Sequence, residues 1–280
     1  MSDAASDGPE AFKAFEHEGW QTVATEYRDF WGPLTQQAVA PLLEAVGAGP
    51  GVRLLDVATG PGYVAATAAE RGARAIGVDF SAAMVAEAGR RYPKVTFQEG
   101  DAEALDFSEA SFDAVTIAFG LLHLARPERA LAEAQRVLRP GGKVGYTVWA
   151  KPEEAVGFQI VLQAIEKHGN PNVPLPLARP FFYFTDPDTS RQALEAAGFI
   201  RPQISKIPQV WRLPSPDTLF EALSTATVRT AGLLRAQSAP ALAAIRAAVR
   251  EGASAFVTAT GGVEIPMPAV LASAERPSHP

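Results

Sequence analysis

The chain of 280 residues contains no cysteine, which excludes disulfide bonds, thiolate metal sites and cysteine nucleophiles. Its longest run of basic residues is Arg90-Arg91 and its formal net charge is −6. A basic face for nucleic acid is therefore not expected. No uninterrupted apolar stretch reaches about 18 residues, so we expect no membrane span. The polar, acidic start lacks the basic-then-apolar order of a signal peptide, which predicts a cytoplasmic protein.

What is present is typical of a globular protein, with 47% hydrophobic and 20% charged residues. The length is enough for one large domain, or for one domain with an additional lobe. The excess of acids suits a cationic ligand, although it is explained equally well by solubility.

From Val52 onward, short apolar runs alternate with helical periodicity. Such alternation predicts βαβ units, a parallel sheet and right-handed crossovers. The expected strands are residues 52–58, 74–79, 94–98, 112–118 and 143–149, and the expected helices are residues 63–71, 82–92 and 127–138.

Two further strands are expected over residues 203–212 and 263–274. The roughly fifty residues between them are too many for a hairpin loop and predict a helical insertion. The expected organisation is a disordered tail (1–9), an N-terminal helical lid (10–48), a catalytic domain (49–212 and 259–276) and a helical lid insertion (213–258).

The first strand ends in a turn of small residues, in which Ala58, Gly60 and Gly62 let the backbone approach a ligand closely. The helix that follows points its unpaired N–H groups at the same place. Acids stand at the ends of three consecutive strands, at Asp56, Asp79 and Asp101. Ligands of open α/β sheets bind beyond these strand ends, so we expect a polar ligand there.

Five segments resemble motifs of the class I S-adenosylmethionine-dependent methyltransferases. Residues 55–62 (LDVATGPG) resemble the first motif, 77–81 (GVDFS) the acidic second-strand motif and 99–103 (EGDAE) the adenine motif. Residues 112–115 (FDAV) are similar to the start of the fourth strand, and 136–143 (RVLRPGGK) to the turn before the fifth.

These segments span roughly residues 50–150 in the family's order. The sequence of residues 56–60 (Asp-Val-Ala-Thr-Gly) is similar to the first motif of the quinone-biosynthesis C-methyltransferases. The resemblance implies an α/β fold with a Rossmann-like, seven-stranded, mostly parallel sheet, an antiparallel last strand and helices on both faces. It also implies S-adenosyl-L-methionine as cofactor, S-adenosyl-L-homocysteine as product, and a small-molecule methyl acceptor.

For the cofactor, the resemblance implies that Asp56 and the Gly60 backbone meet the methionine end. Asp79 accepts hydrogen bonds from the ribose hydroxyls, as a carboxylate with two oxygens can. Asp101 accepts from the adenine amino group, and the Ala102 N–H donates to the adenine ring.

The remaining implied cofactor contacts come from Phe80 and Met84 beside the adenine, Ala118 beside the sulfonium and Tyr27 near the methionine carboxylate. Other interpretations stay open at this stage. A strand-end acid can simply cap a helix, and Phe80 and Met84 can simply be core residues.

A base is needed only if the acceptor must lose a proton, and His123, just past the fourth strand, is the candidate. It is equally compatible with a histidine at a helix start. The acceptor can be an O, N or activated C nucleophile. The aromatic residues Phe158, 181–184 and Trp211 either line an apolar acceptor pocket or only pack the lid.

Two other functions remain as alternatives. The spacing Gly60-x-Gly62-x-x-Ala65 also fits an NAD(P)-dependent oxidoreductase, although Asp56, Asp101 and the Arg-Pro-Gly-Gly turn do not belong to that class. A non-catalytic S-adenosylmethionine-binding protein would share every motif. No metal is expected, because the fourth strand ends in Ala118-Phe119-Gly120 without a carboxylate. The aromatic N-terminal region leaves a homodimer open.

Overall fold

The computed structural model describes residues 8–176 and 179–278. In this part of the chain, seven strands form one sheet in the order β3-β2-β1-β4-β5-β9-β6. The strands are β1 (Arg53–Val57), β2 (Arg74–Asp79), β3 (Thr96–Glu99), β4 (Phe112–Ala118), β5 (Leu138–Trp149), β6 (Ile200–Ile207) and β9 (Ala269–Glu275).

The first five strands pair in parallel, whereas β9 runs antiparallel between β5 and β6. This arrangement confirms the expected mostly parallel sheet with an antiparallel last strand. The central strands β1 and β4 are buried on both faces, which explains their nearly continuous apolar sequences. Their carboxyl ends meet at one edge of the sheet.

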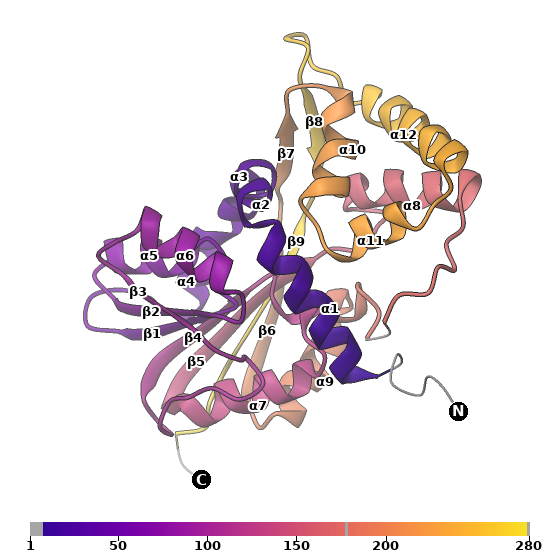
Figure 1. The fold of residues 1–280 in the computed structure, drawn as a ribbon. Helices are drawn as coiled ribbons and strands as arrows, with labels where there is room; N and C mark the ends of the chain where they lie inside the picture. Colours follow the sequence, from indigo (N-terminus) through magenta and orange to yellow (C-terminus); the bar gives the residue numbers. More distant parts are fainter. Residues whose placement is uncertain (1–7, 177–178, 279–280) are drawn as a thin grey trace, which may run out of the picture.

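Helices cover both faces of the sheet, with α4, α5 and α6 on one side and α7 and α9 on the other (Figure 1). Their bounds are α4 (Val39–Ala45), α5 (Tyr63–Glu70), α6 (Ala82–Arg91), α7 (Pro127–Val137) and α9 (Pro187–Ala196). The three helices expected over 63–71, 82–92 and 127–138 end within two residues of these bounds. Side chains of Ser81 and Asp186 cap α6 and α9.

The two strands expected over 203–212 and 263–274 are each broken in two, which corrects the prediction. Their other halves form a separate two-stranded ribbon of β7 (Val210–Leu213) and β8 (Val263–Pro266). Ile207 pairs with Ala269, and Val210 pairs with Pro266, so the register is the same on both sides of the break. In that register Pro208 stands opposite Pro268. Neither proline has an N–H to donate, so the ladder is interrupted at this point.

The β7–β8 ribbon carries three helices above the sheet, α10 (Pro216–Thr225), α11 (Arg229–Arg235) and α12 (Ala239–Ser254) (Figure 1). Helix α8 (Val156–His168) packs against α12 and completes this upper part. The N-terminal segment contributes α1 (Pro9–Thr22), α2 (Ala24–Phe30), α3 (Gly32–Thr35) and the short 3-10 helix η1 (Gln36–Ala38). We call α10, α11, α12 and α8 the lid helices.

The fifth strand begins at Leu138, not at residue 143 as expected. Phe112 pairs with Leu138 and Ala114 with Lys143, so the Arg-Pro-Gly-Gly turn is a large bulge inside the strand. Two backbone hydrogen bonds hold that bulge against the C-terminal segment. One runs from the Gly141 N–H to the Arg276 carbonyl, and the other from the Arg276 N–H to the Gly142 carbonyl. The other strands of the first half begin and end within two residues of the expected positions.

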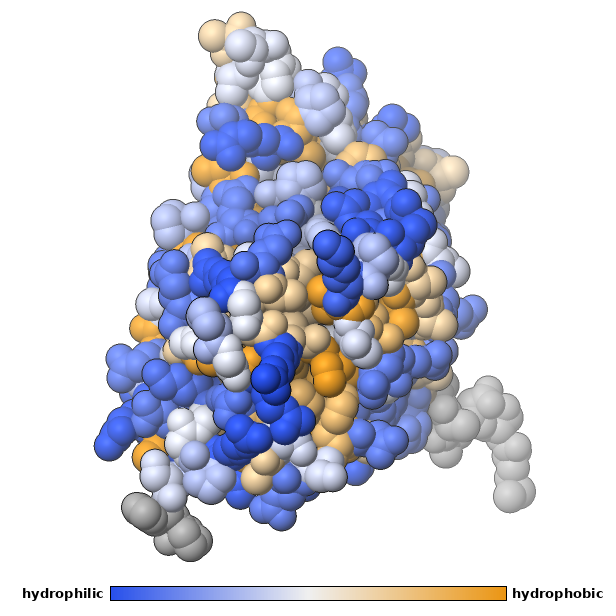
Figure 2. Space-filling view, turned by 90° about the vertical axis from the view of Figure 1, so that its left-hand side faces the viewer, coloured by the Kyte–Doolittle hydropathy of each residue, from blue (hydrophilic) through white to orange (hydrophobic). Residues whose placement is uncertain are grey.

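Most of the tail expected over residues 1–9 lies outside the described residues, although α1 already begins at Pro9. Across the described ranges, no helix combines the length and the apolar composition that a membrane crossing requires. Seen from the side on which α5 and α6 lie, the surface is mostly hydrophilic, and hydrophobic residues gather across its middle (Figure 2).

Gly62 is the N-cap of α5, with a left-handed φ of 84°. A Cβ at this position would lie 2.7 Å from the ring of Phe97. Gly47 has a similar φ of 68°, but nothing lies within 4 Å of its missing Cβ.

We therefore expect Gly62→Ala to lower the free energy of unfolding much more than Gly47→Ala. Backbone strain costs both variants about 1–2 kcal/mol, and overpacking against Phe97 adds roughly 1–3 kcal/mol in Gly62→Ala alone. Urea unfolding of the two variants measures the difference. Equal losses would contradict the steric role assigned to Gly62.

Candidate active site

A large pocket lies at the carboxyl ends of β1, β2 and β4, and residues of α1, α2, α8 and α11 also line it. It holds about 1280 Å³ of empty space, part of it in the open mouth. The turn after β1 and the segment after β4 form its floor, and Lys13 and Trp20 of α1 line it as well. This is the place at which open α/β sheets bind ligands.

Two strand ends on the pocket floor adopt left-handed backbone conformations at residues other than glycine. Ala58 has a φ of 53° and Phe119 a φ of 54°. Gly120 allows the two turns to touch, because a Cβ on it would lie 2.6 Å from the Cβ of Ala58. Strained backbone of this kind persists where the surroundings fix it, and here it sharpens both turns beneath the cavity.

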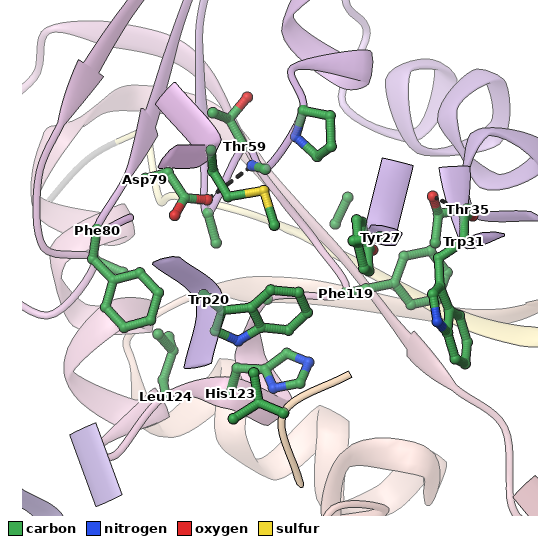
Figure 3. Close-up of a pocket in the computed structure, with 18 of the residues that line it drawn as sticks. Trp20, Tyr27, Trp31, Thr35, Thr59, Asp79, Phe80, Phe119, His123 and Leu124 are labelled. Atoms are coloured by element: carbon green, nitrogen blue, oxygen red, sulfur yellow. Dashed lines mark hydrogen bonds between the residues drawn. The ribbon is translucent and has the colours of Figure 1, made fainter. Parts of the chain in front are cut away.

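Asp79 joins the ends of β1 and β2. Its Oδ2 accepts a hydrogen bond from the Gly60 N–H at 2.8 Å (Figure 3). Its Oδ1 accepts a hydrogen bond from the Ser81 N–H at 2.9 Å. The residue is only 5% exposed. Burial raises the pKa of Asp79 to about 6, against the opposing effect of these two N–H donors. Each carboxylate oxygen retains a lone pair for a ligand.

Asp56 lies behind the turn and does not line the pocket. It is 1% exposed and accepts hydrogen bonds from the hydroxyls of Thr59, at 2.5 Å, and Thr116, at 2.8 Å. Burial raises its pKa to about 7, although both hydroxyls oppose this. The carboxyl group therefore fastens the turn to β4 from within.

Asp101 lies at the pocket rim and is paired with α1. Lys13 Nζ lies 2.5 Å from Asp101 Oδ2, and Oδ1 accepts the Glu103 N–H at 2.9 Å. The guanidinium group of Arg126 adds a second link to α1, because it donates hydrogen bonds to the carboxylates of both Glu103 and Glu10. These ion pairs hold the N-terminal helix over the end of β3.

Beyond the β4 segment, the pocket continues into a group of aromatic rings that we call the aromatic chamber, defined by Trp31, Phe119, Trp149, Phe158 and Phe181. Phe119 stacks on Trp149 with centroids 4.2 Å apart, and Phe158 lies 5.4 Å from Phe181. In Figure 3, Asp79 and Phe80 lie on one side of the pocket and Phe119 and Trp31 on the other. A polar end and an aromatic end thus share one cavity.

His123 lies between these two ends, on the short helix η2 (Leu121–His123). Its Nδ1 lies 3.0 Å from Oε2 of Glu16, and the same oxygen accepts the indole N–H of Trp20 at 2.9 Å. Glu16 is 0% exposed, and its Oε1 has no partner among the described residues. Trp20 also packs edge-on against the imidazole, with centroids 4.9 Å apart (Figure 3). Glu16 and Trp20 therefore fix the orientation of the ring.

The structure brings ten of the twelve predicted site residues to this pocket: Tyr27, Ala58, Gly60, Asp79, Phe80, Met84, Asp101, Ala102, Ala118 and His123. Asp56 and Gly62 do not line it. Of the aromatic residues considered for the acceptor, Phe158 and Phe181 line the pocket, whereas Trp211 packs behind it against Trp31.

Sequence reasoning missed the polar contributions of α1 and α11, namely Lys13, Glu16 and Arg229. A signal for Glu16 was present, because Phe12, Glu16 and Trp20 recur at a spacing of four and share one helix face. An acid in the middle of an apolar stripe must find a buried partner. For Lys13 and Arg229 no comparable pattern exists.

In this mostly parallel sheet the strand order reverses between β1 and β4, which is where α/β proteins bind their ligands. A glycine turn with an acid beside it at this point defines a site for a nucleotide-type cofactor. The residues suit S-adenosylmethionine, because Asp79 has lone pairs for a diol and Gly60 leaves open space where a side chain would otherwise project.

Comparison with known proteins identifies the family within this class of α/β proteins. A family model described as a methyltransferase domain matches residues 55–145. A demethylmenaquinone methyltransferase from Renibacterium salmoninarum is 36% identical over 167 residues, covering 56% of this chain and 70% of that protein. Another, from Beutenbergia cavernae, is 44% identical over 123 residues, covering 42% of this chain and 51% of that protein.

Among solved structures, phosphoethanolamine N-methyltransferase 2 from Haemonchus contortus in complex with S-adenosyl-L-methionine superposes with a TM-score of 0.56. It is 20% identical, with 95% of this chain and 60% of that chain covered, and shows the shared fold. The chain belongs to the class I S-adenosylmethionine-dependent methyltransferases, in the group that includes those of quinone biosynthesis. It is an enzyme of small-molecule methyl transfer that uses S-adenosylmethionine as cofactor.

Proposed function

We propose that the methyl acceptor is a flat, mostly apolar aromatic molecule bearing a hydroxyl group, methylated at that oxygen or at the ring carbon it activates. The observation that carries the proposal is the aromatic chamber, which continues from the β4 turn and is closed by the lid helices. Its rings offer faces and edges for stacking a planar ring. Relatives named demethylmenaquinone methyltransferases support an acceptor of this shape.

Within the polar end, we assign Asp79 to the ribose hydroxyls and Asp101 to the adenine amino group, with the Ala102 N–H facing the adenine ring. Phe80 and Met84 flank the base on the pocket side. Lys13 holds the carboxylate of Asp101 in place, and one oxygen of that carboxylate still has a lone pair for the base. Tyr27 and Ala118 lie toward the methionine end.

When bound, S-adenosylmethionine supplies an electrophilic methyl group, to which the acceptor's electron pair forms a bond while the carbon–sulfur bond breaks and its electrons remain on sulfur. The protein's contribution is alignment, which can supply about 7–11 kcal/mol in favourable cases. The strained turns at Ala58 and Phe119 fix the floor. The lid helices exclude water.

His123 removes the acceptor's hydroxyl proton. Its Nδ1 is held by Glu16, so its Nε2 is the nitrogen left to accept the proton. Glu16 acts as a positioning residue, because its carboxylate keeps the imidazole in one tautomer and stabilises the cation that forms.

The acceptor is tested by incubating the full chain and S-adenosylmethionine with three probes: a reduced naphthoquinone, 2-naphthol and histamine. We expect transfer to the two hydroxylated aromatic rings, detected as a mass increase of one methyl group with S-adenosylhomocysteine release. Transfer to histamine alone would contradict the proposal.

Asp79→Asn tests the ribose assignment. We expect the affinity for S-adenosylhomocysteine to fall about 10–100-fold, because charge-assisted hydrogen bonds are lost. In the wild type the pKa of Asp79 is raised to about 6, so its carboxylate forms as the pH rises through 6, and binding should strengthen from pH 5 to pH 7.5.

Calorimetry at both pH values measures this difference. The variant should lose most of the pH dependence, and Asp106→Asn, at an exposed position, should behave as the wild type. Wild-type affinity in Asp79→Asn would contradict the assignment.

His123→Gln should lower kcat for a hydroxylated aromatic acceptor by roughly 10²–10⁴-fold, since proton removal is lost. Its affinity for S-adenosylhomocysteine should stay near the wild-type value. His168→Gln, at the C-terminal end of α8 and outside the pocket, is the matched control. An unchanged kcat in His123→Gln would show that this residue is no base.

A further inference from the structure

Arg229 opens helix α11 and lines the pocket from the lid side. Its guanidinium carbon lies 5.3 Å from the ring centroid of Phe12 and 5.3 Å from that of Phe181. Contact with two rings, one from α1 and one from the chamber, restricts the position of the guanidinium group.

The guanidinium group has few polar partners. Its single hydrogen bond within residues 8–176 and 179–278 is a long one, 3.4 Å from Nη1 to the Leu122 carbonyl. No carboxylate in those ranges lies within 4.0 Å of it. Lys13, the other cation of the pocket lining, is by contrast paired with Asp101. Arginine carries five N–H donors, so most of those of Arg229 have no acceptor in the described protein.

This arrangement carries an energetic cost, because a charge among apolar groups is costly unless it is paired. Burial lowers the pKa of Arg229, and the buried carboxylate of Glu16 opposes that effect from a distance. An anionic oxygen in the pocket would supply the missing partner. Arginine suits such an oxygen, since its planar group can donate two parallel hydrogen bonds.

The neighbours of Arg229 place it at the acceptor end. Phe181, which it contacts, lies 6.0 Å from His123 and 5.4 Å from Phe158, ring centroid to ring centroid. In the described part of the chain, neither Asp79 nor Gly60 is a hydrogen-bond or ring partner of Arg229. Arg229 and His123 therefore face the same part of the cavity.

We propose that Arg229 binds an acidic oxygen, phenolic or carboxylic, on the aromatic acceptor. The proposal rests on the proposed function and adds a recognition group to it. For a phenolic acceptor, His123 takes the hydroxyl proton and Arg229 holds the resulting oxyanion. The negative charge then increases electron density on that oxygen and on the adjacent ring carbons.

The test is equilibrium binding to the full chain saturated with S-adenosylhomocysteine, so that no turnover is required. The probes are 2-naphthoate, 2-naphthol and the neutral 2-methoxynaphthalene. Arg229→Gln should weaken binding of 2-naphthoate or 2-naphthol about 10–100-fold, which is the usual loss for a charge-assisted hydrogen bond. Binding of 2-methoxynaphthalene should be nearly unchanged, and the probe that loses more identifies the phenolic or the carboxylic source.

Two variants serve as controls. Arg235→Gln removes an exposed charge from the same helix and should bind all three probes as the wild type does. Arg229→Lys keeps the charge without the planar fork and should recover part of the affinity. This second variant keeps the proposal testable if Arg229→Gln folds poorly.

Equal losses for all three probes would overturn the proposal, since they would assign Arg229 a packing role. A parallel loss of affinity for S-adenosylhomocysteine would also overturn it, since the arginine would then bind the methionine carboxylate. If the methyl-transfer assay fails while selective probe binding persists, the acceptor chemistry is wrong but the anion site stands.

Discussion

The hydrogen bonds from the Gly60 and Ser81 N–H groups to the two oxygens of Asp79 are the constraint on which the site depends. They tie the turn after β1 to the end of β2, so two neighbouring strands end in a single rigid corner. From beneath, Asp56 fastens the same turn to β4 through two threonine hydroxyls. One buried carboxyl group thus lines the cavity, while the other holds the turn beneath it. The sequence places both at strand ends, but their different roles follow only from which one the cavity reaches.

Much of the sheet could be predicted because its signals are local. The apolar runs of β1 and β4, each followed by a glycine turn, predict the strand positions without reference to distant residues. The strands of the C-terminal half of the chain were harder to predict. The run over 203–212 predicts one strand, but in the structure Pro208 stands opposite Pro268 and the strand is broken there. Cross-strand register is a long-range property, so no window around either proline reveals the break.

The pocket likewise has one end that local sequence signals predict and another that depends on tertiary packing. Its polar end follows the strand ends, so Asp79, Asp101 and Gly60 could be found from motif and spacing. Its other end is also lined by α1, η2 and α11, whose contacts join residues more than a hundred positions apart, such as Glu16 with His123 and Arg229 with Phe12. Helical periodicity predicts that α1 buries one face, but it does not say against what. Tertiary packing supplied that information.

The paired prolines at the base of the β7–β8 ribbon have a consequence for how this molecule can diversify. The hydrogen-bonded ladder of the main sheet stops at Pro208 and Pro268, yet the register resumes beyond them without a slip. Changes in length or tilt of the upper ribbon therefore do not shift the alternation of inward and outward side chains in β6 and β9. The ribbon that carries α11, whose first residues line the pocket, can be remodelled while the corner formed by Gly60 and Asp79 stays unchanged.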